Sequence, residues 1–172
     1  MPSLRLETVL IPAALAVALG AFALIGGALA FEHWGHFIPC DLCLPQRGPP
    51  VVATLIALWA LACAPSAPRA SALLLAAAMP VLLIGTGLGL HHAGVEQHWW
   101  AGPAACTGTT NPFPVTPGDF AGAVKNTHIV RCDEIAWEMF GVSLAGYNAL
   151  ISLALAVLAG LPLAIIQCEE GR

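Results

Sequence analysis

Charged side chains are scarce in this sequence, where Asp, Glu, Lys and Arg together make up only 9% of 172 residues. Soluble domains carry about 25% charged residues, so the composition lies outside the soluble globular range. Ten acidic residues outnumber six basic ones, and the net charge of −4 argues against the basic surface that nucleic-acid binding requires. Hydrophobic residues supply 58% of the chain. These proportions predict a membrane protein with no nucleic-acid partner.

Long uncharged runs divide the chain into four blocks, at residues 8–31, 48–68, 70–95 and 139–168. A membrane-spanning helix needs about 20 mostly apolar residues, because lipid offers its backbone amides no other hydrogen-bond partner. Each block meets that length. We therefore predict an all-α membrane protein, a single four-transmembrane-helix bundle over residues 1–172. Its predicted spans are about 9–31, 48–64, 70–90 and 141–166.

The predicted spans leave two loops on one side of the membrane, at about 32–47 and 91–140. Four spans place both termini on the other side, together with a tight turn between spans two and three. That side has few residues, yet it carries half of the basic ones, namely Arg5, Arg69 and Arg172. Basic residues concentrate in short cytoplasmic segments, so we predict cytoplasmic termini and extracytoplasmic loops.

The six cysteines are distributed unevenly between the two predicted sides. Four of them fall in the outer loops, whereas Cys63 and Cys168 fall at the inner ends of spans. The outer four are Cys40, Cys43, Cys106 and Cys132. Disulfides form and persist outside the cytoplasm, so the outer cysteines predict two disulfides and the inner two predict free thiols. Three pairings are possible, and the simplest closes one disulfide within each loop.

The two simplest pairs would differ in chemistry. A disulfide between Cys106 and Cys132 would stabilise the fold by about 3.5 kcal/mol, because it lowers the conformational entropy of the unfolded chain. A purely structural role is therefore open for it. A Cys40–Cys43 bond closes a loop too short to stabilise much, and short CxxC pairs are typically redox-active. Zinc sites favour two close cysteine pairs, and Leu44 stands where a c-type haem motif requires histidine. We therefore predict no metal.

Arg47 follows Cys43 by four residues, at the outer mouth of the second predicted span. One interpretation is an ordinary interfacial anchor. The other is a cation that favours the Cys43 thiolate and donates hydrogen bonds to a lipid-soluble carbonyl compound. A cycling dithiol needs an electron acceptor, and the sequence contains no flavin or nicotinamide fingerprint. By elimination, the predicted acceptor is a membrane quinone.

Three segments carry a family resemblance. CDLCLPQR (40–47), HAGVE followed by WWAGPAAC (92–106) and CDEIAWEMFGVSLAGYN (132–148) together resemble the DsbB family of disulfide-bond formation proteins. The resemblance implies a thiol:quinone oxidoreductase of the bacterial inner membrane, with its redox loops facing the periplasm. It also implies ubiquinone or menaquinone as the electron acceptor. The implied partner is a periplasmic thioredoxin-fold dithiol protein, DsbA-like, which this chain would re-oxidise.

The resemblance also implies roles for individual residues. Cys106 would form the mixed disulfide with the partner, and Cys132 would be its loop mate. Electrons would pass on to Cys40 and Cys43, with Cys43 beside the quinone. Arg47 would polarise a quinone oxygen, and His92 would be a quinone neighbour.

Two features of the sequence qualify the resemblance. Pro45 and Gly48 stand where bulkier residues are expected beside the motif. Asp133 and Glu134 directly follow Cys132 and should disfavour its thiolate, partly offset by Arg131. The competing hypothesis is a non-catalytic four-span membrane scaffold whose outer loops are held by structural disulfides.

Overall fold

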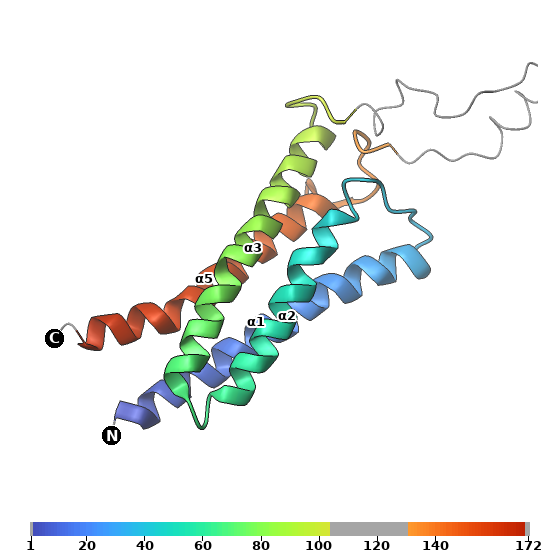
Figure 1. The fold of residues 1–172 in the computed structure, drawn as a ribbon. Helices are drawn as coiled ribbons and strands as arrows, with labels where there is room; N and C mark the ends of the chain where they lie inside the picture. Colours follow the sequence, from blue (N-terminus) through green and yellow to red (C-terminus); the bar gives the residue numbers. More distant parts are fainter. Residues whose placement is uncertain (1, 104–130, 171–172) are drawn as a thin grey trace, which may run out of the picture.

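The computed structural model describes residues 2–103 and 131–170. Its main elements are four helices, a single 3-10 turn and two short strands. In chain order they are α1 (Pro2–His33), η1 (Pro45–Arg47), α2 (Gly48–Cys63), α3 (Pro68–Glu96), β1 (Glu138–Met139), β2 (Val142–Ser143) and α5 (Leu144–Glu170). The helices pack side by side in an elongated bundle (Figure 1). The chain ends and the α2–α3 turn lie at one end, and the connections holding Cys40 and Cys132 lie at the other, here called the loop end.

The helices occupy the four predicted blocks. Three of them are long and apolar enough to cross a membrane, over Thr8–His33, Pro68–Glu96 and Leu144–Cys168. The second helix, α2, has 16 residues and rises about 24 Å, short of the roughly 30 Å hydrocarbon layer. It begins at Gly48, as predicted, because Pro49 and Pro50 fit only a first helical turn. The described chain therefore confirms three candidate spans, and a fourth crossing by α2 remains a prediction.

One predicted boundary is wrong. The long loop was expected from residue 91, but α3 continues to Glu96. The sequence HHAGVE contains no proline, and two of its polar residues, His92 and Glu96, are buried in the bundle at the loop end, so nothing ends the helix there. His92 consequently lies on the last turns of α3, against the connection between α1 and α2.

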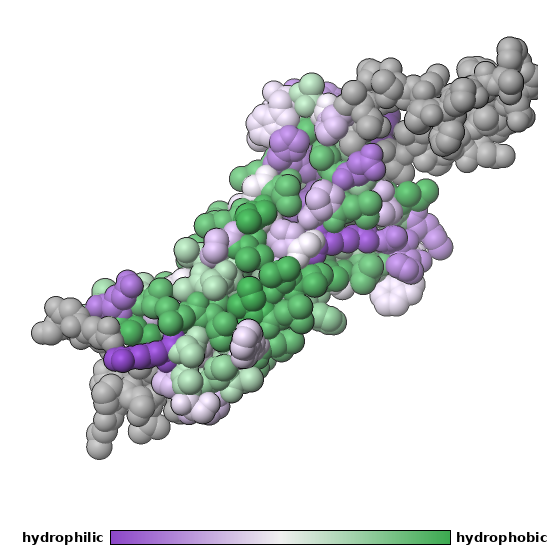
Figure 2. Space-filling model, viewed as in Figure 1, coloured by the Kyte–Doolittle hydropathy of each residue, from purple (hydrophilic) through white to green (hydrophobic). Residues whose placement is uncertain are grey.

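Small residues form the interior of the bundle. The fully buried core of described helix residues is dominated by alanines, among them Ala14, Ala53, Ala57, Ala72 and Ala159. Large apolar side chains point outward instead, including Leu19, Phe22, Leu55, Leu73 and Ile84. Figure 2 shows apolar residues gathered over the middle of the bundle, with hydrophilic residues towards its ends. Helices with small inner and large outer residues are typical of membrane bundles, where close backbone approach replaces the hydrophobic effect.

The contact of α3 with α5 depends on Gly89. A Cβ atom at this position would lie 2.9 Å from the Ala145 carbonyl oxygen and 2.9 Å from the Ala149 backbone nitrogen. We expect Gly89→Ala to lower the free energy of unfolding in mixed detergent micelles by about 1–3 kcal/mol, because both obstructing atoms are backbone. Gly87→Ala is the matched control, since a Cβ there meets nothing within 4 Å. Equal stability of the two variants would contradict this packing.

A short hairpin introduces α5. The strands pair antiparallel through Glu138 with Ser143, and the turn residues Phe140 and Gly141 both have positive φ, at 53° and 75°. Two positive φ values define the type I′ turn that suits two-residue hairpins. The Ser143 hydroxyl then accepts a hydrogen bond from the Gly146 backbone N–H at 3.2 Å, which caps α5. The hairpin thereby fixes the loop end beside the cysteines.

Candidate active site

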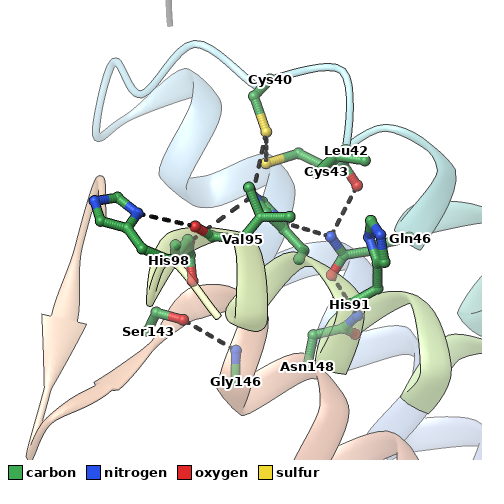
Figure 3. Close-up of polar contacts among 12 residues, drawn as sticks. Cys40, Leu42, Cys43, Gln46, His91, Val95, His98, Ser143, Gly146 and Asn148 are labelled. Atoms are coloured by element: carbon green, nitrogen blue, oxygen red, sulfur yellow. Dashed lines mark hydrogen bonds and ion pairs between the residues drawn. The ribbon is translucent and has the colours of Figure 1, made fainter. Parts of the chain in front are cut away.

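Cys40 and Cys43 lie on a tight turn that leads into η1. The Cys43 backbone N–H donates to the Cys40 carbonyl oxygen at 3.0 Å, which folds the two side chains towards each other. Both thiols are free, and their sulfurs are 2.9 Å apart (Figure 3). A single 3-10 turn, η1, connects this motif to α2, with Pro45 as its first residue. The sequence motif therefore places two thiols in direct contact.

The two thiols differ in acidity. The hydrogen bond with Cys43 and burial raise the pKa of Cys40 to about 12. The same hydrogen bond, donated by the Cys40 thiol, lowers the pKa of Cys43 and outweighs the opposing effect of burial. Cys43 is therefore the sulfur that becomes the thiolate, and Cys40 keeps the proton.

Arg47 has a partner that the sequence analysis did not assign. Its guanidinium lies 2.7 Å from a carboxylate oxygen of Glu32, at the end of α1. The main cause of the lowered pKa of Cys43 is the Cys40 thiol, rather than the Arg47 cation that the spacing suggested. A single carboxylate at the mouth of span one, facing an arginine at the mouth of span two, is the sequence signal for this pair.

His92 reaches the dithiol from α3. It is 4% exposed, and its Nε2 lies 3.5 Å from the Cys40 sulfur. Its Nδ1 lies 2.8 Å from the side-chain nitrogen of Gln46, and Gln46 also accepts a hydrogen bond from Asn148 at 2.9 Å. Sequence reasoning missed Gln46 and Asn148. Gln46 is part of the cysteine motif, but Asn148 is 102 residues further along the chain and only the fold brings it here.

Cys132 joins the same buried cluster. It is fully buried and packs with Cys40 and Val95. Its proximity also acts on Cys43, since a charge on Cys132 raises the pKa of the Cys43 thiol, although less than Cys40 lowers it. Three of the four predicted redox cysteines therefore meet at the loop end. The fourth, Cys106, lies outside the described residues, and its pairing with Cys132 remains a prediction.

The acidic residues after Cys132 share one neighbouring cation. Arg131 forms two hydrogen bonds with the Asp133 carboxylate, at 2.8 and 3.0 Å, and lies 3.4 Å from Glu134. This contact lowers the pKa of Asp133. The offset by Arg131 that the sequence suggested is present.

A cavity of about 330 Å³ adjoins the dithiol. Its polar lining includes Cys43, Arg47 and His92, and most of its wall is apolar and comes from α1 and α5. Trp137 and Tyr147 also line it. The ring centroid of Trp137 lies 5.1 Å from that of Phe31 and 6.1 Å from that of Tyr147. Small-molecule sites typically have this size, apolar walls and a few convergent polar groups.

Among the described residues, one group of side chains has the geometry to hold a metal ion. The sulfurs of Cys40 and Cys43 and one ring nitrogen of His92 all lie within 4.8 Å of one another. Two sulfurs and an imidazole are ligands that Zn²⁺ accepts. His92 could bind a metal through Nε2 only if that nitrogen carried no proton.

Comparison with known proteins covers the whole of this site. The family model described as "Disulfide bond formation protein DsbB" matches residues 11–162, nearly the entire chain. The matched region contains Arg47, His92 and the four cysteines that were predicted to lie in the outer loops. No curated protein matches the sequence.

Proposed function

We propose that this chain, which belongs to the DsbB family of disulfide-bond formation membrane proteins, is a quinone-dependent protein-dithiol oxidase. Electrons would enter at Cys106 and Cys132 from a DsbA-like thioredoxin-fold partner. They would pass to Cys40 and Cys43 and leave on ubiquinone or menaquinone. The loop end would face the periplasm of a bacterial inner membrane, with the termini in the cytoplasm.

One observation carries the proposal: the more acidic thiol, Cys43, lines an apolar cavity together with Arg47. A thiolate is the nucleophilic and electron-donating form of cysteine. A guanidinium is a fixed cation with several N–H donors, suited to a carbonyl oxygen that gains negative charge. An apolar wall with a thiolate and a cation is the environment that a quinone ring requires.

The cysteine cluster supports the order of thiol exchange. The partner's thiolate would attack the Cys106–Cys132 disulfide, so that the partner leaves oxidised and both loop cysteines are reduced. Cys132 would next attack the Cys40–Cys43 disulfide at Cys40, which releases Cys43 as a thiolate. Cys106 would then attack Cys132, restoring the Cys106–Cys132 disulfide and leaving Cys40 reduced. Burial of Cys132 against Cys40 favours this route.

The remaining step regenerates the Cys40–Cys43 disulfide. A quinone bound in the cavity supplies a two-electron acceptor that also takes up two protons. Cys43 would donate the electrons as a thiolate, and Cys40 would lose its proton as its sulfur bonds to that of Cys43. Arg47, held against Glu32 at 2.7 Å, would hold the electron acceptor in place through its remaining N–H groups.

Quinone titration of the fully reduced protein, under nitrogen, tests the proposal. We expect each added short-chain quinone to be reduced at the expense of two thiols, with a transient charge-transfer absorption band as Cys43 donates. Peptide mapping should find the new disulfide between Cys40 and Cys43. If the thiols remain reduced while quinone is in excess, the oxidase is excluded and the stapled membrane scaffold becomes the better account.

A further inference from the structure

The Gln46 side-chain amide has a single possible orientation. Its nitrogen donates to the Leu42 backbone carbonyl oxygen at 2.8 Å, and a carbonyl oxygen can only accept. Its oxygen accepts from the Asn148 side-chain nitrogen at 2.9 Å. Figure 3 shows Gln46 between Leu42 and Asn148. Rotating the amide by 180° would place two oxygens against each other at Leu42 and lose both hydrogen bonds.

This orientation determines where His92 carries its proton. The same Gln46 nitrogen lies 2.8 Å from His92 Nδ1, so Nδ1 must accept the hydrogen bond and cannot hold a hydrogen. A neutral imidazole has one N–H, and which nitrogen bears it follows from the hydrogen bond made by the other. The hydrogen is therefore on Nε2, the nitrogen that faces the Cys40 sulfur at 3.5 Å.

Placing the hydrogen on Nε2 sets the direction of every later contact. His92 donates to the Cys40 sulfur, so the Cys40 thiol hydrogen is directed at its other neighbour, the Cys43 sulfur at 2.9 Å. Hydrogen bonds arranged donor to acceptor in one direction strengthen one another, especially when buried. The chain of hydrogen bonds begins at the Gln46 donor and passes through His92 and Cys40. Its last acceptor is the Cys43 sulfur.

We propose that Gln46, held by Asn148 and Leu42, is a positioning residue that fixes the Nε2–H form of His92 and thereby assigns the thiolate to Cys43. With the opposite form, the Nε2 lone pair would accept the Cys40 thiol hydrogen, and Cys43 would lose its donor. The proposal rests on the proposed function only in that the Cys43 thiolate is the electron donor. The proposal concerns only where two hydrogens rest, the ring hydrogen of His92 and the thiol hydrogen of Cys40.

The groups around His92 are consistent with this arrangement. Glu96, one turn further along α3, approaches Nε2 to 3.8 Å, beyond hydrogen-bond distance, so Cys40 is the nearer acceptor. The other charged residues that line the cavity are paired, Arg47 with Glu32 at 2.7 Å and Arg131 with Glu134 at 3.4 Å. The Nε2 hydrogen also occupies the lone pair that a metal ion would need, which opposes metal binding by Cys40, Cys43 and His92 in this state.

The first test reads the histidine ring directly. The reduced protein, labelled with ¹⁵N-histidine, is studied by NMR, and a His92→Gln variant identifies the His92 signals. We expect an unprotonated Nδ1 and a protonated Nε2 in the unmodified protein. In Gln46→Glu the carboxylate can only accept, so Nδ1 should become protonated. A protonated Nδ1 in the unmodified protein, or an unchanged ring in Gln46→Glu, overturns the proposal.

The second test reads the thiols, which a merely structural role of Gln46 would leave unchanged. In Gln46→Met the amide is replaced by an apolar chain of similar length, so the His92 form is no longer fixed. We expect alkylation of Cys43 at neutral pH, followed by peptide mapping, to slow by up to about tenfold, because the thiolate loses part of one hydrogen bond once His92 samples both forms. The pH profile of the reaction should move to higher pH.

Thr86→Ala is the control for this second test. Its hydroxyl is buried in α3 and bonded to the Leu82 carbonyl oxygen, with no link to the cysteines, so its Cys43 profile should stay unchanged. A Gln46→Met profile identical to that of the unmodified protein overturns the proposal. Failure here is distinguishable from failure of the oxidase: an inverted His92 ring in a protein that still reduces quinone refutes the positioning role alone.

Discussion

Replacing Cys43 with serine is expected to lower quinone reduction at least about a thousandfold, as the loss of a reacting nucleophile does in other enzymes. Serine keeps the size of the side chain, so the turn before α2 should be retained. Its hydroxyl does not ionise near neutral pH and cannot form a disulfide with Cys40. The variant therefore lacks both the electron donor and the disulfide that stores the oxidised state. The measurement is quinone-reduction rate with a reduced thioredoxin-fold protein as substrate.

Cys63→Ser supplies the matched control for this loss. Cys63 is also a free, half-buried thiol, but it is the last residue of α2, at the opposite end of the bundle from the cavity. Its replacement should leave the rate unchanged. Normal turnover by Cys43→Ser would show that electrons do not pass through the turn cysteines. An equal loss in Cys63→Ser would point to a general structural defect.

Cys40→Ser separates electron donation from turnover. A serine hydroxyl at position 40 can still donate a hydrogen bond to Cys43, so the thiolate should persist and still interact with quinone. Turnover should nevertheless stop, because no disulfide can form at the turn. The two serine variants are thus expected to share the loss of rate and to differ in the charge-transfer absorption, which only Cys40→Ser retains.

Much of the fold follows directly from the sequence. Uncharged runs of sufficient length predict helices, and prolines at 49 and 50 predict where α2 begins. The end of α3 was misplaced because His91, His92 and Glu96 look like loop residues when read singly. Tertiary burial lets His92 and Glu96 remain helical, since both face partners inside the bundle. A hydropathy pattern detects lipid exposure well and polar burial poorly.

The candidate site was predictable only in part. Cys40, Cys43 and Arg47 are close in sequence, so their proximity follows from local spacing. One interpretation of Arg47 was a cation that favours the Cys43 thiolate, but the largest cause of the lowered pKa of Cys43 is the Cys40 thiol, and Arg47 pairs with Glu32 on another helix. The Gln46–Asn148 contact joins residues 102 positions apart, and no local pattern contains it. Residues that act on a site through a hydrogen bond from a distant element are those that sequence spacing leaves out.

The cavity gives a second large effect that depends on no cysteine. Gly27 of α1 lines the cavity, and a Cβ atom at this position meets nothing within 4 Å. We expect Gly27→Phe to place its ring in the space that a quinone would occupy without displacing the helix. Binding of quinone beside this ring would overpack the cavity, which costs about 1–3 kcal/mol. That cost corresponds to a rise in the KM for quinone of roughly fivefold to over a hundredfold.

Gly26→Phe is the matched control, because it introduces the same side chain at the neighbouring position. Gly26 neighbours Gly27, is exposed and likewise meets nothing within 4 Å, but it does not line the cavity. Its ring should enter the surrounding lipid, and the KM for quinone should stay unchanged. Thiol exchange with the protein substrate should be normal in both variants, because that exchange takes place between cysteines and needs no quinone. If Gly27→Phe reduces quinone with an unchanged KM, the electron acceptor binds elsewhere and the apolar cavity has another purpose.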